Sequence, residues 1–400
     1  MKRYPITKPF LGDEELEALR GPIETGWLVQ GPNVKKFEAM FAERIGVQHA
    51  VATSNCTSGL HLGLLALGIG PGDAVIVPSF TYIATANAVE YCGGRPVFCD
   101  IDLETFNIDV NQVEDLCKKE KGIKAVIPVS LFGLSADMEA VLETAERYGL
   151  RVLEDAACAL GAESDGRHAG TWRDAAAFSF HPRKPITTGE GGMLTTNDAA
   201  VAEKVRKLRD HGAEASDLER HTKEGGSLLP EFRMLGYNYR MTDLQGAIGV
   251  VQMEKADRIL DGRRAGAALY DAALKDFGWL IPPRVPARKI HAYQSYVTLL
   301  SPGEARRPDL SVMPELNRKR NRFMALLERE GVSTRQGTHA VHTLDYYRKK
   351  YGLNEHDFPN ALLADRLSMA LPLYWNITRE DVSEIVGRME ENWKKVNRDE

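Results

Sequence analysis

The sequence predicts an α/β fold: a large domain with a mainly parallel sheet flanked by helices, and a smaller α+β domain at the C-terminus. Short apolar runs typical of buried strands alternate with helical patterns along the first two-thirds of the 400 residues. Such alternation favours parallel strand pairing. Five prolines between 282 and 308 then mark a change in composition. We therefore expect a large domain over 1–264, whose N-terminal segment could pack on the small domain, and a small domain over 265–400.

In the large domain, short apolar runs predict strands at 74–77, 96–99, 125–129, 151–154, 175–180 and 193–196. Apolar residues recur at helical spacing over 34–45, 58–68, 137–149 and 240–262. The 58–68 pattern is apolar nearly all round, as is typical of a buried helix. Gly149 is well placed to end the third of these helices.

In the small domain, the proline-rich stretch 280–312 is expected to form loops and edge strands, because proline cannot donate a hydrogen bond within a sheet. Two helices are expected, at about 313–331 and 379–396. The second has Thr378 at a plausible N-cap position and an apolar face that includes Val382, Ile385 and Met389.

Composition excludes several classes of protein. The 51 basic and 56 acidic residues give a net charge of −5 and no support for nucleic-acid binding. No apolar run approaches the roughly 18 residues of a membrane span, and the N-terminus lacks the apolar core of a signal peptide. Five cysteines without a C-x-x-C pair make a disulfide framework or a metal site unexpected. We expect a cytoplasmic protein.

The strongest chemical signal lies in 178–192. An apolar strand runs directly into Lys184, and a glycine-rich turn and a further strand follow. A lysine at such a position can have its amine pKa lowered from about 10.4 and act as a nucleophile that forms a Schiff base. For a lone lysine, an ordinary loop position is the simpler interpretation. Arg183 beside it could anchor a phosphate or a carboxylate, or could be merely exposed.

A carboxylate pair, Glu154 and Asp155, ends another apolar strand. Ligands collect at such strand ends in open α/β sheets. An acid there could hold the protonated pyridine nitrogen of pyridoxal phosphate and so make the ring an electron sink. A helix cap or a salt bridge explains the pair equally well when it is taken alone.

Two further features follow strand ends. The 53–59 segment opens the apolar helix, where backbone N–H groups and the hydroxyls of Thr57 and Ser58 suit a phosphate, although a plain N-cap is the simpler interpretation. This segment matches neither common nucleotide-binding glycine motif. The ring of Tyr82 could stack on a flat cofactor, whereas core packing explains Phe80 better.

Each feature is weak alone, but their order is informative. A phosphate helix, a ring stacker, an acid and a lysine follow one another, each where a strand passes into a loop or helix. Parallel strands could therefore gather all four at one edge of the sheet.

Over nearly its whole length the sequence resembles the sugar-nucleotide aminotransferases of the DegT/StrS group, pyridoxal-phosphate enzymes of the aspartate-aminotransferase fold (fold type I). The most specific stretches are 179–184 with 187–192, and 236–243. The other landmarks are 26–28, 31–32, 71–73, 78–81, 98–102, 154–157 and 371–374.

The resemblance implies a pyridoxal 5'-phosphate site. Lys184 would be the catalytic lysine bonded to the cofactor, Asp155 would bind the pyridine nitrogen and Tyr82 would stack on the ring. Many members have glutamine or histidine, thought to contact the ring hydroxyl, where this chain has Cys158. A thiol is a weaker hydrogen-bond partner, so this contact stays open.

The phosphate site implied by the resemblance has two parts. Thr57, Ser58 and Ser179 would bind the phosphate from the same chain. Asn238 would reach the phosphate of the neighbouring subunit's cofactor, which implies a homodimer with shared active sites.

The implied activity is transfer of an amino group from an amino acid, L-glutamate by analogy, to a nucleotide-linked ketosugar in amino-sugar or surface-polysaccharide biosynthesis. The 187–192 stretch is similar to relatives that act on 4-keto-6-deoxy sugars. Related dehydratases carry histidine where this chain has Lys184, which favours transamination. A pyridoxal-phosphate dehydratase or lyase and a non-catalytic cofactor-binding regulator remain as alternatives.

Overall fold

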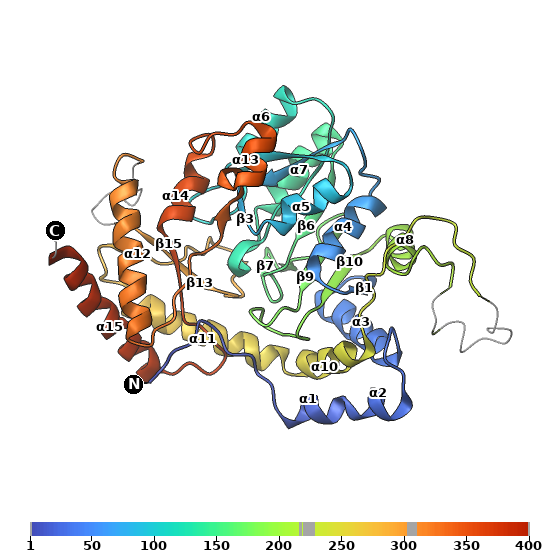
Figure 1. Cartoon of the computed structure of the whole chain (residues 1–400), viewed down its shortest axis with the longest axis horizontal. Coiled ribbons are helices and arrows are strands. Elements are labelled where there is room, and N and C mark those ends of the chain that lie inside the picture. Colours follow the sequence, from blue (N-terminus) through green and yellow to red (C-terminus); the bar gives the residue numbers. More distant parts are fainter. Residues whose placement is uncertain (1, 216–217, 219–228, 302–309, 399–400) are drawn as a thin grey trace.

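The computed structural model describes residues 2–215, 218, 229–301 and 310–398. A seven-stranded sheet forms the centre of the large domain (Figure 1). From one edge to the other its strands are β1 (His49–Thr53), β10 (Gly192–Thr196), β9 (Ala175–Ser179), β6 (Arg151–Asp155), β5 (Ile123–Val126), β2 (Ala74–Pro78) and β4 (Arg95–Cys99). The strands from β9 to β4 run parallel, which confirms the mainly parallel sheet.

The strand β10 is antiparallel to both of its neighbours, β9 and β1. Residues 180–191 join β9 to β10 through a loop and not through a crossover helix, so the chain can reverse direction there. β1, which the sequence did not predict, consequently runs parallel to β9. The carboxyl ends of β1, β2, β6 and β9 therefore lie at the same edge of the sheet.

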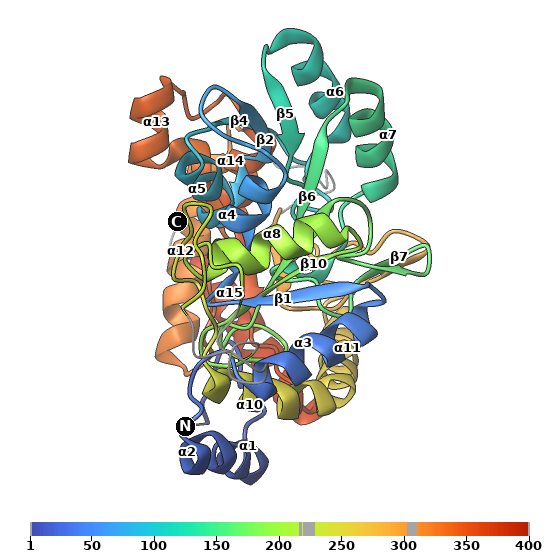
Figure 2. The same ribbon diagram turned by 90° about the vertical axis from the view of Figure 1, so that its right-hand side faces the viewer.

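Helices bury both faces of this sheet. One face is covered by α4 (Cys56–Ala66), α5 (Ala84–Tyr91) and α8 (Ala199–Arg209). The other is covered by α3 (Pro32–Ile45), α10 (Asp243–Glu254), α6 (Val110–Lys119) and α7 (Met138–Tyr148). Figure 2 shows α8 and α3 on opposite sides of β1. Alternate residues serve the two cores, since Val51 packs in one while Ala50 and Ala52 pack in the other.

The C-terminal part is built on a smaller antiparallel sheet of β11 (Leu280–Ile281), β13 (Tyr296–Leu300) and β15 (Ser368–Leu371). It packs with α12 (Met313–Arg329), α14 (Pro359–Leu367) and α15 (Arg379–Arg398). β13 is the central strand, so the expectation of only edge strands over 280–312 was wrong. β13 contains no proline and can pair on both sides. Residues 302–309 of that stretch lie outside the described residues.

The expected single helix over 240–262 is two helices, α10 and α11 (Ala256–Ala273), which meet at Lys255. α11 is longer than predicted and continues past residue 264. Ile259 near its start packs in a large-domain core, whereas Tyr270 near its end packs in the small-domain core. The helix therefore contributes to both cores.

The N-terminal segment lies against the small domain. Tyr4 is fully buried in the small-domain core, and its backbone N–H donates to the carbonyl of Gly331. The next elements, α1 (Asp13–Ala18) and α2 (Arg20–Thr25), return to α10. Within the described ranges, no helix is both long and apolar enough to cross a membrane.

Candidate active site

Lys184 lies in the loop between β9 and β10, at the carboxyl edge of the sheet. Its Nζ donates a hydrogen bond to Sγ of Cys158 at 3.2 Å. Burial lowers the pKa of Lys184, but Cys158, together with Cys56 and Asp155, raises it by more, so that it lies above the usual value. The lowered pKa that the sequence analysis considered for such a lysine is therefore not seen in the chain alone, where the sulfur of Cys158 opposes it.

Asp155 ends β6 on the same face of the sheet as α4 and α5. Its carboxylate accepts hydrogen bonds from Oγ1 of Thr85 at 2.7 Å and from the N–H of Ala157 at 3.1 Å. Burial raises the pKa of Asp155, whereas these two donors and the charge of Lys184 act in the opposite direction. Both hydrogen-bond donors are neutral, so a protonated ring nitrogen would supply the close positive charge that a buried carboxylate needs.

Glu154 points to the opposite face of the sheet. Its carboxylate accepts hydrogen bonds from Oγ of Ser130 at 2.5 Å and from the N–H of Gly170 at 2.7 Å. Burial raises the pKa of Glu154 to about 7. The alternation of side chains along β6 thus separates a carboxylate that faces the site from one that joins two loops beneath the sheet.

α4 begins at Cys56, two residues before the predicted start. Asn55 is its N-cap and accepts a hydrogen bond from the N–H of Ser58 at 2.9 Å. Thr57 and Ser58 therefore lie in the first turn, where free backbone N–H groups attract anions. Oγ of Ser58 lies 3.0 Å from Oγ of Ser54, which places two hydroxyls at the same helix end.

The close approach of α4 to the sheet depends on Gly192. Ser179 pairs with Gly192 across β9 and β10, and Gly192 pairs with Thr53 across β10 and β1. A Cβ atom on Gly192 would lie 2.4 Å from the carbonyl carbon of Asn55. Because Gly192 has no side chain, the start of α4 can lie against β10, the strand next to Ser179. The start of α4 and Ser179 can therefore face the same anion.

Tyr82 directly follows β3 (Phe80–Thr81), and its side chain is 66% exposed. Its carbonyl accepts a hydrogen bond at 3.2 Å from Oγ1 of Thr85, the residue that also holds Asp155. β3 pairs with β14 (His339–Ala340), and His339 lies opposite Thr81, the residue before Tyr82. Phe80 is fully buried, as expected from its assignment to the core.

Asn238 is exposed, and the residue after it lies close to the start of α4, because the N–H of Ser54 donates to the carbonyl of Tyr239. Tyr237 and Tyr239 stack on each other at 5.1 Å and pack edge-on against His61 of α4. Asn238, between them, is left to project outward. The sequence analysis did not predict that these two tyrosines stack on either side of Asn238, although the alternating Tyr-Asn-Tyr pattern permits it.

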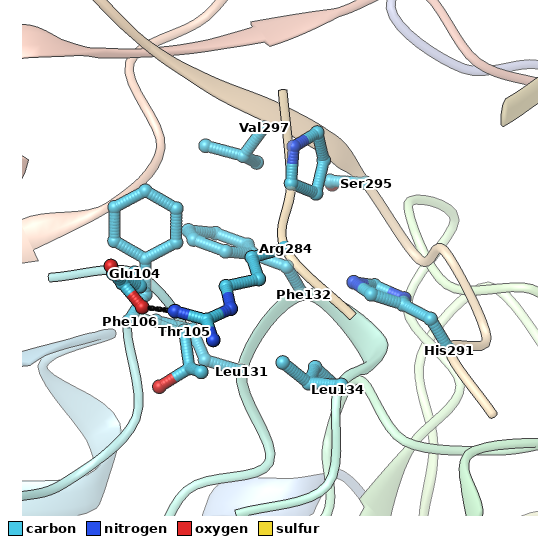
Figure 3. A pocket seen from close by; sticks show the side chains of 11 residues that line it. Glu104, Thr105, Phe106, Leu131, Phe132, Leu134, Arg284, His291, Ser295 and Val297 are labelled. Atoms are coloured by element: carbon cyan, nitrogen blue, oxygen red, sulfur yellow. Dashed lines mark ion pairs between the residues drawn. The ribbon is translucent and has the colours of Figure 1, made fainter. Parts of the chain in front are cut away.

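A separate small cavity lies where the loop after β5 meets residues 283–297 (Figure 3). Its volume is about 10 Å³, enough for one water molecule. Arg284 and Glu104 form an ion pair in its lining. His291 is buried there, and burial lowers its pKa to about 3. The cavity is too small for a sugar or a cofactor.

Together, the residues at the carboxyl edge of the sheet suit pyridoxal phosphate. They offer an amine, a buried carboxylate, an exposed aromatic ring and a helix N-terminus with hydroxyls. No group of three metal-ligating side chains occurs among the described residues.

The family profile of the DegT/DnrJ/EryC1/StrS aminotransferases matches residues 9–390. The spore coat polysaccharide biosynthesis protein SpsC of Bacillus subtilis is 38% identical over 384 residues, 96% of this chain and 95% of that protein. GDP-perosamine synthase of Caulobacter vibrioides is 36% identical over 98% of each chain. The structure of Helicobacter pylori PseC, an aminotransferase of pseudoaminic acid biosynthesis, is similar with a TM-score of 0.88 and 26% identity over 98% of this chain and 100% of that one. The chain therefore belongs to the DegT/DnrJ/EryC1/StrS aminotransferase family.

Proposed function

We propose that this protein is a pyridoxal-phosphate-dependent aminotransferase that moves an amino group from an amino acid to a nucleotide-linked ketosugar. Family membership and relatives named for carbohydrate biosynthesis support this proposal. The observation that carries it is the Lys184 amine at the carboxyl edge of the sheet, on the same side as the buried carboxylate of Asp155.

The family uses pyridoxal phosphate, which supplies an electron sink for the negative charge that develops at the donor Cα. Lys184 would hold the cofactor covalently, Asp155 would hold its ring nitrogen, and Tyr82 would cover one face of the ring. The phosphate would lie against the first turn of α4, which contains Thr57 and Ser58, and near Ser179.

Proton transfer falls to Lys184. The donor would be an amino acid, L-glutamate by family analogy. The Lys184 amine would take a proton from the donor Cα as a base and deliver it as an acid. Thr85 orients Asp155 during these steps, because its hydroxyl donates to the carboxylate at 2.7 Å.

The proposed acceptor is a 4-keto-6-deoxy sugar attached to a nucleoside diphosphate. The similarity of the 187–192 stretch to that of relatives acting on such sugars supports the choice of sugar, and the name of the Caulobacter relative, GDP-perosamine synthase, supports the nucleoside diphosphate. The product would be an amino sugar for a surface polysaccharide or a related glycan.

We also propose a homodimer in which Asn238 reaches the phosphate held by the partner. Three apolar residues that precede Asn238 in the sequence are largely exposed in the single chain: Leu229 at 85%, Phe232 at 59% and Leu235 at 84%. Large exposed apolar side chains are typical of a surface that binds another protein.

Replacing Lys184 by alanine tests the assignment. We expect kcat with glutamate and a nucleotide-linked ketosugar to fall by about a thousandfold or more, because both the covalent link and the proton carrier are lost. Borohydride reduction of the cofactor-loaded wild type, followed by peptide mapping, should locate the cofactor on Lys184. Lys118→Ala, at an exposed lysine of α6, serves as the control.

Substantial turnover by Lys184→Ala, or a reduced adduct at another lysine, would overturn the proposal. Mass spectrometry of the product separates the alternatives. A product without the new nitrogen would indicate a dehydratase or lyase, and no reaction of the bound cofactor with glutamate would indicate a regulator.

A further inference from the structure

The contact between Cys158 and Lys184 is built by two short turns. Asp155 ends β6, and the N–H of Ala159 then donates to the carbonyl of Ala156, which turns the chain and brings Cys158 over the sheet edge. The N–H of Lys184 donates to the carbonyl of His181 in a second turn. The two side chains meet with Nζ 3.2 Å from Sγ.

Cys158 differs from the other four cysteines in its surroundings. Burial raises the pKa of each of the other thiols, those of Cys56, Cys92, Cys99 and Cys117. For Cys92 the pKa reaches about 12. A raised pKa favours the unreactive thiol form. Cys158 is only half-buried, and its Sγ lies 3.2 Å from the amine nitrogen of Lys184. A neighbouring ammonium group favours attack by a thiolate.

We propose that Cys158 and Lys184 form a thiol–amine pair in which Cys158 is a modification site: its reaction with a small disulfide excludes the cofactor, and bound cofactor protects the thiol. This inference rests on the proposed function, since it takes Lys184 as the residue that bonds to the cofactor. It assigns Cys158 a reactivity that a glutamine or histidine at this position could not have.

The chemistry is a thiol–disulfide exchange with a low-molecular-weight disulfide as co-reactant. Sγ of Cys158 attacks one sulfur of the disulfide, the disulfide bond breaks, and a mixed disulfide forms on Cys158. The other half of the reagent leaves as a thiolate and takes up the proton lost by Cys158, to become a thiol. A second thiol reverses the reaction.

Exclusion of the cofactor follows from the distance. A group added to Sγ starts about one bond length from this sulfur, which itself lies 3.2 Å from Nζ of Lys184. The added group therefore occupies space beside Nζ. The cofactor aldehyde has to approach the same nitrogen to form its bond. Conversely, a cofactor bonded to Lys184 would occupy the space beside the sulfur, which lies 3.2 Å from Nζ.

The first experiment treats full-length protein stripped of cofactor with 2-hydroxyethyl disulfide and follows each cysteine by peptide mass mapping. We expect Cys158 to react about tenfold or more faster than Cys117, the other half-buried cysteine. Lys184→Gln should slow the reaction at Cys158 and leave Cys117 unchanged. Protein already loaded with pyridoxal phosphate should be protected at Cys158 alone.

The second experiment adds pyridoxal phosphate to the modified protein, followed by borohydride reduction and mapping of Lys184. The modified wild type should form little adduct at Lys184, and dithiothreitol should restore it. Cys117→Ser should behave like the wild type. Cys158→Ser should form the adduct to the same extent with and without disulfide treatment.

The results separate the two proposals. If untreated wild type forms no adduct at Lys184, the proposed function fails. If untreated protein forms the adduct but Cys158 reacts no faster than Cys117, or the modified protein loads equally well, only the thiol–amine inference is overturned.

Discussion

At the scale of single residues, adjacent positions on β6 have opposite roles. Asp155 faces α5 and the candidate site, whereas Glu154 lies beneath the sheet and joins the loops of Ser130 and Gly170. The sequence places both acids at one strand end. The structure identifies Asp155 as the acid on the α4 and α5 side by the face of the strand that it occupies.

Glu154→Gln should change how the stability of the cofactor-free protein depends on pH. Burial raises the pKa of Glu154 from 4.5 to about 7, so folding favours its protonated form. The stabilisation present below pH 4.5 is therefore lost as the pH rises through about 7. Glutamine stays neutral, and its amide can accept from Gly170 and donate to Ser130.

We expect Glu154→Gln to remove this part of the pH dependence, at most about 3 kcal/mol of unfolding free energy. Denaturant unfolding of cofactor-free protein at pH 5 and pH 8 measures it. Glu146→Gln, at an exposed position of α7, is the matched control. A wild type and a Glu154→Gln variant with the same pH dependence would contradict the assignment.

At the scale of elements, the site depends on how closely α4 approaches β10. Gly192→Ala would place a Cβ atom 2.4 Å from the carbonyl carbon of Asn55, so the helix start would have to move. We expect weaker cofactor binding and a loss of about 1–3 kcal/mol of stability. Cofactor titration and thermal unfolding measure these two effects.

Gly59→Ala, on the helix α4 itself, is the matched control. Its Cβ would lie 3.4 Å from both Cβ of Ala177 and Oγ1 of Thr53, which is ordinary contact. Because alanine favours a helix over glycine by up to about 1 kcal/mol, this variant should be as stable as the wild type or more stable. Equal losses in the two variants would contradict the role given to Gly192.

Periodicity and motif order predicted the parallel strands and the gathering of Lys184, Asp155 and the α4 start at one edge. Features that depend on contacts distant in sequence were missed. The antiparallel direction of β10 depends on the path of the loop 180–191, which the length of the loop does not predict. Cys158 and Lys184 lie in two turns 26 residues apart, and the sequence of neither turn predicts that the two side chains meet.

At the scale of the whole molecule, the proposed homodimer predicts that the exposed Asn238 serves the active site of the partner subunit. Lys184→Ala and Asn238→Ala should each be poorly active at limiting cofactor. A mixed dimer would combine both defects in one site and leave the other site intact. Co-expression should therefore restore about a quarter of wild-type activity, since half of random dimers are mixed and each has one good site.

Two different affinity tags allow the mixed dimer to be purified and assayed at low pyridoxal phosphate. Each variant co-expressed with itself under both tags provides the baseline. Activity no greater than this baseline would show that Asn238 serves the site of its own chain, or no site.

The position of Tyr4 also has a consequence for how the protein is made. Its hydroxyl donates to Glu384, a residue 380 positions later, so the N-terminal segment lies beside α15 (Figure 1). A ribosome must release nearly the entire polypeptide before this first segment can reach its final place. Until then, a nascent chain leaves the small-domain core open on one side, and translation that stops before residue 384 cannot close it.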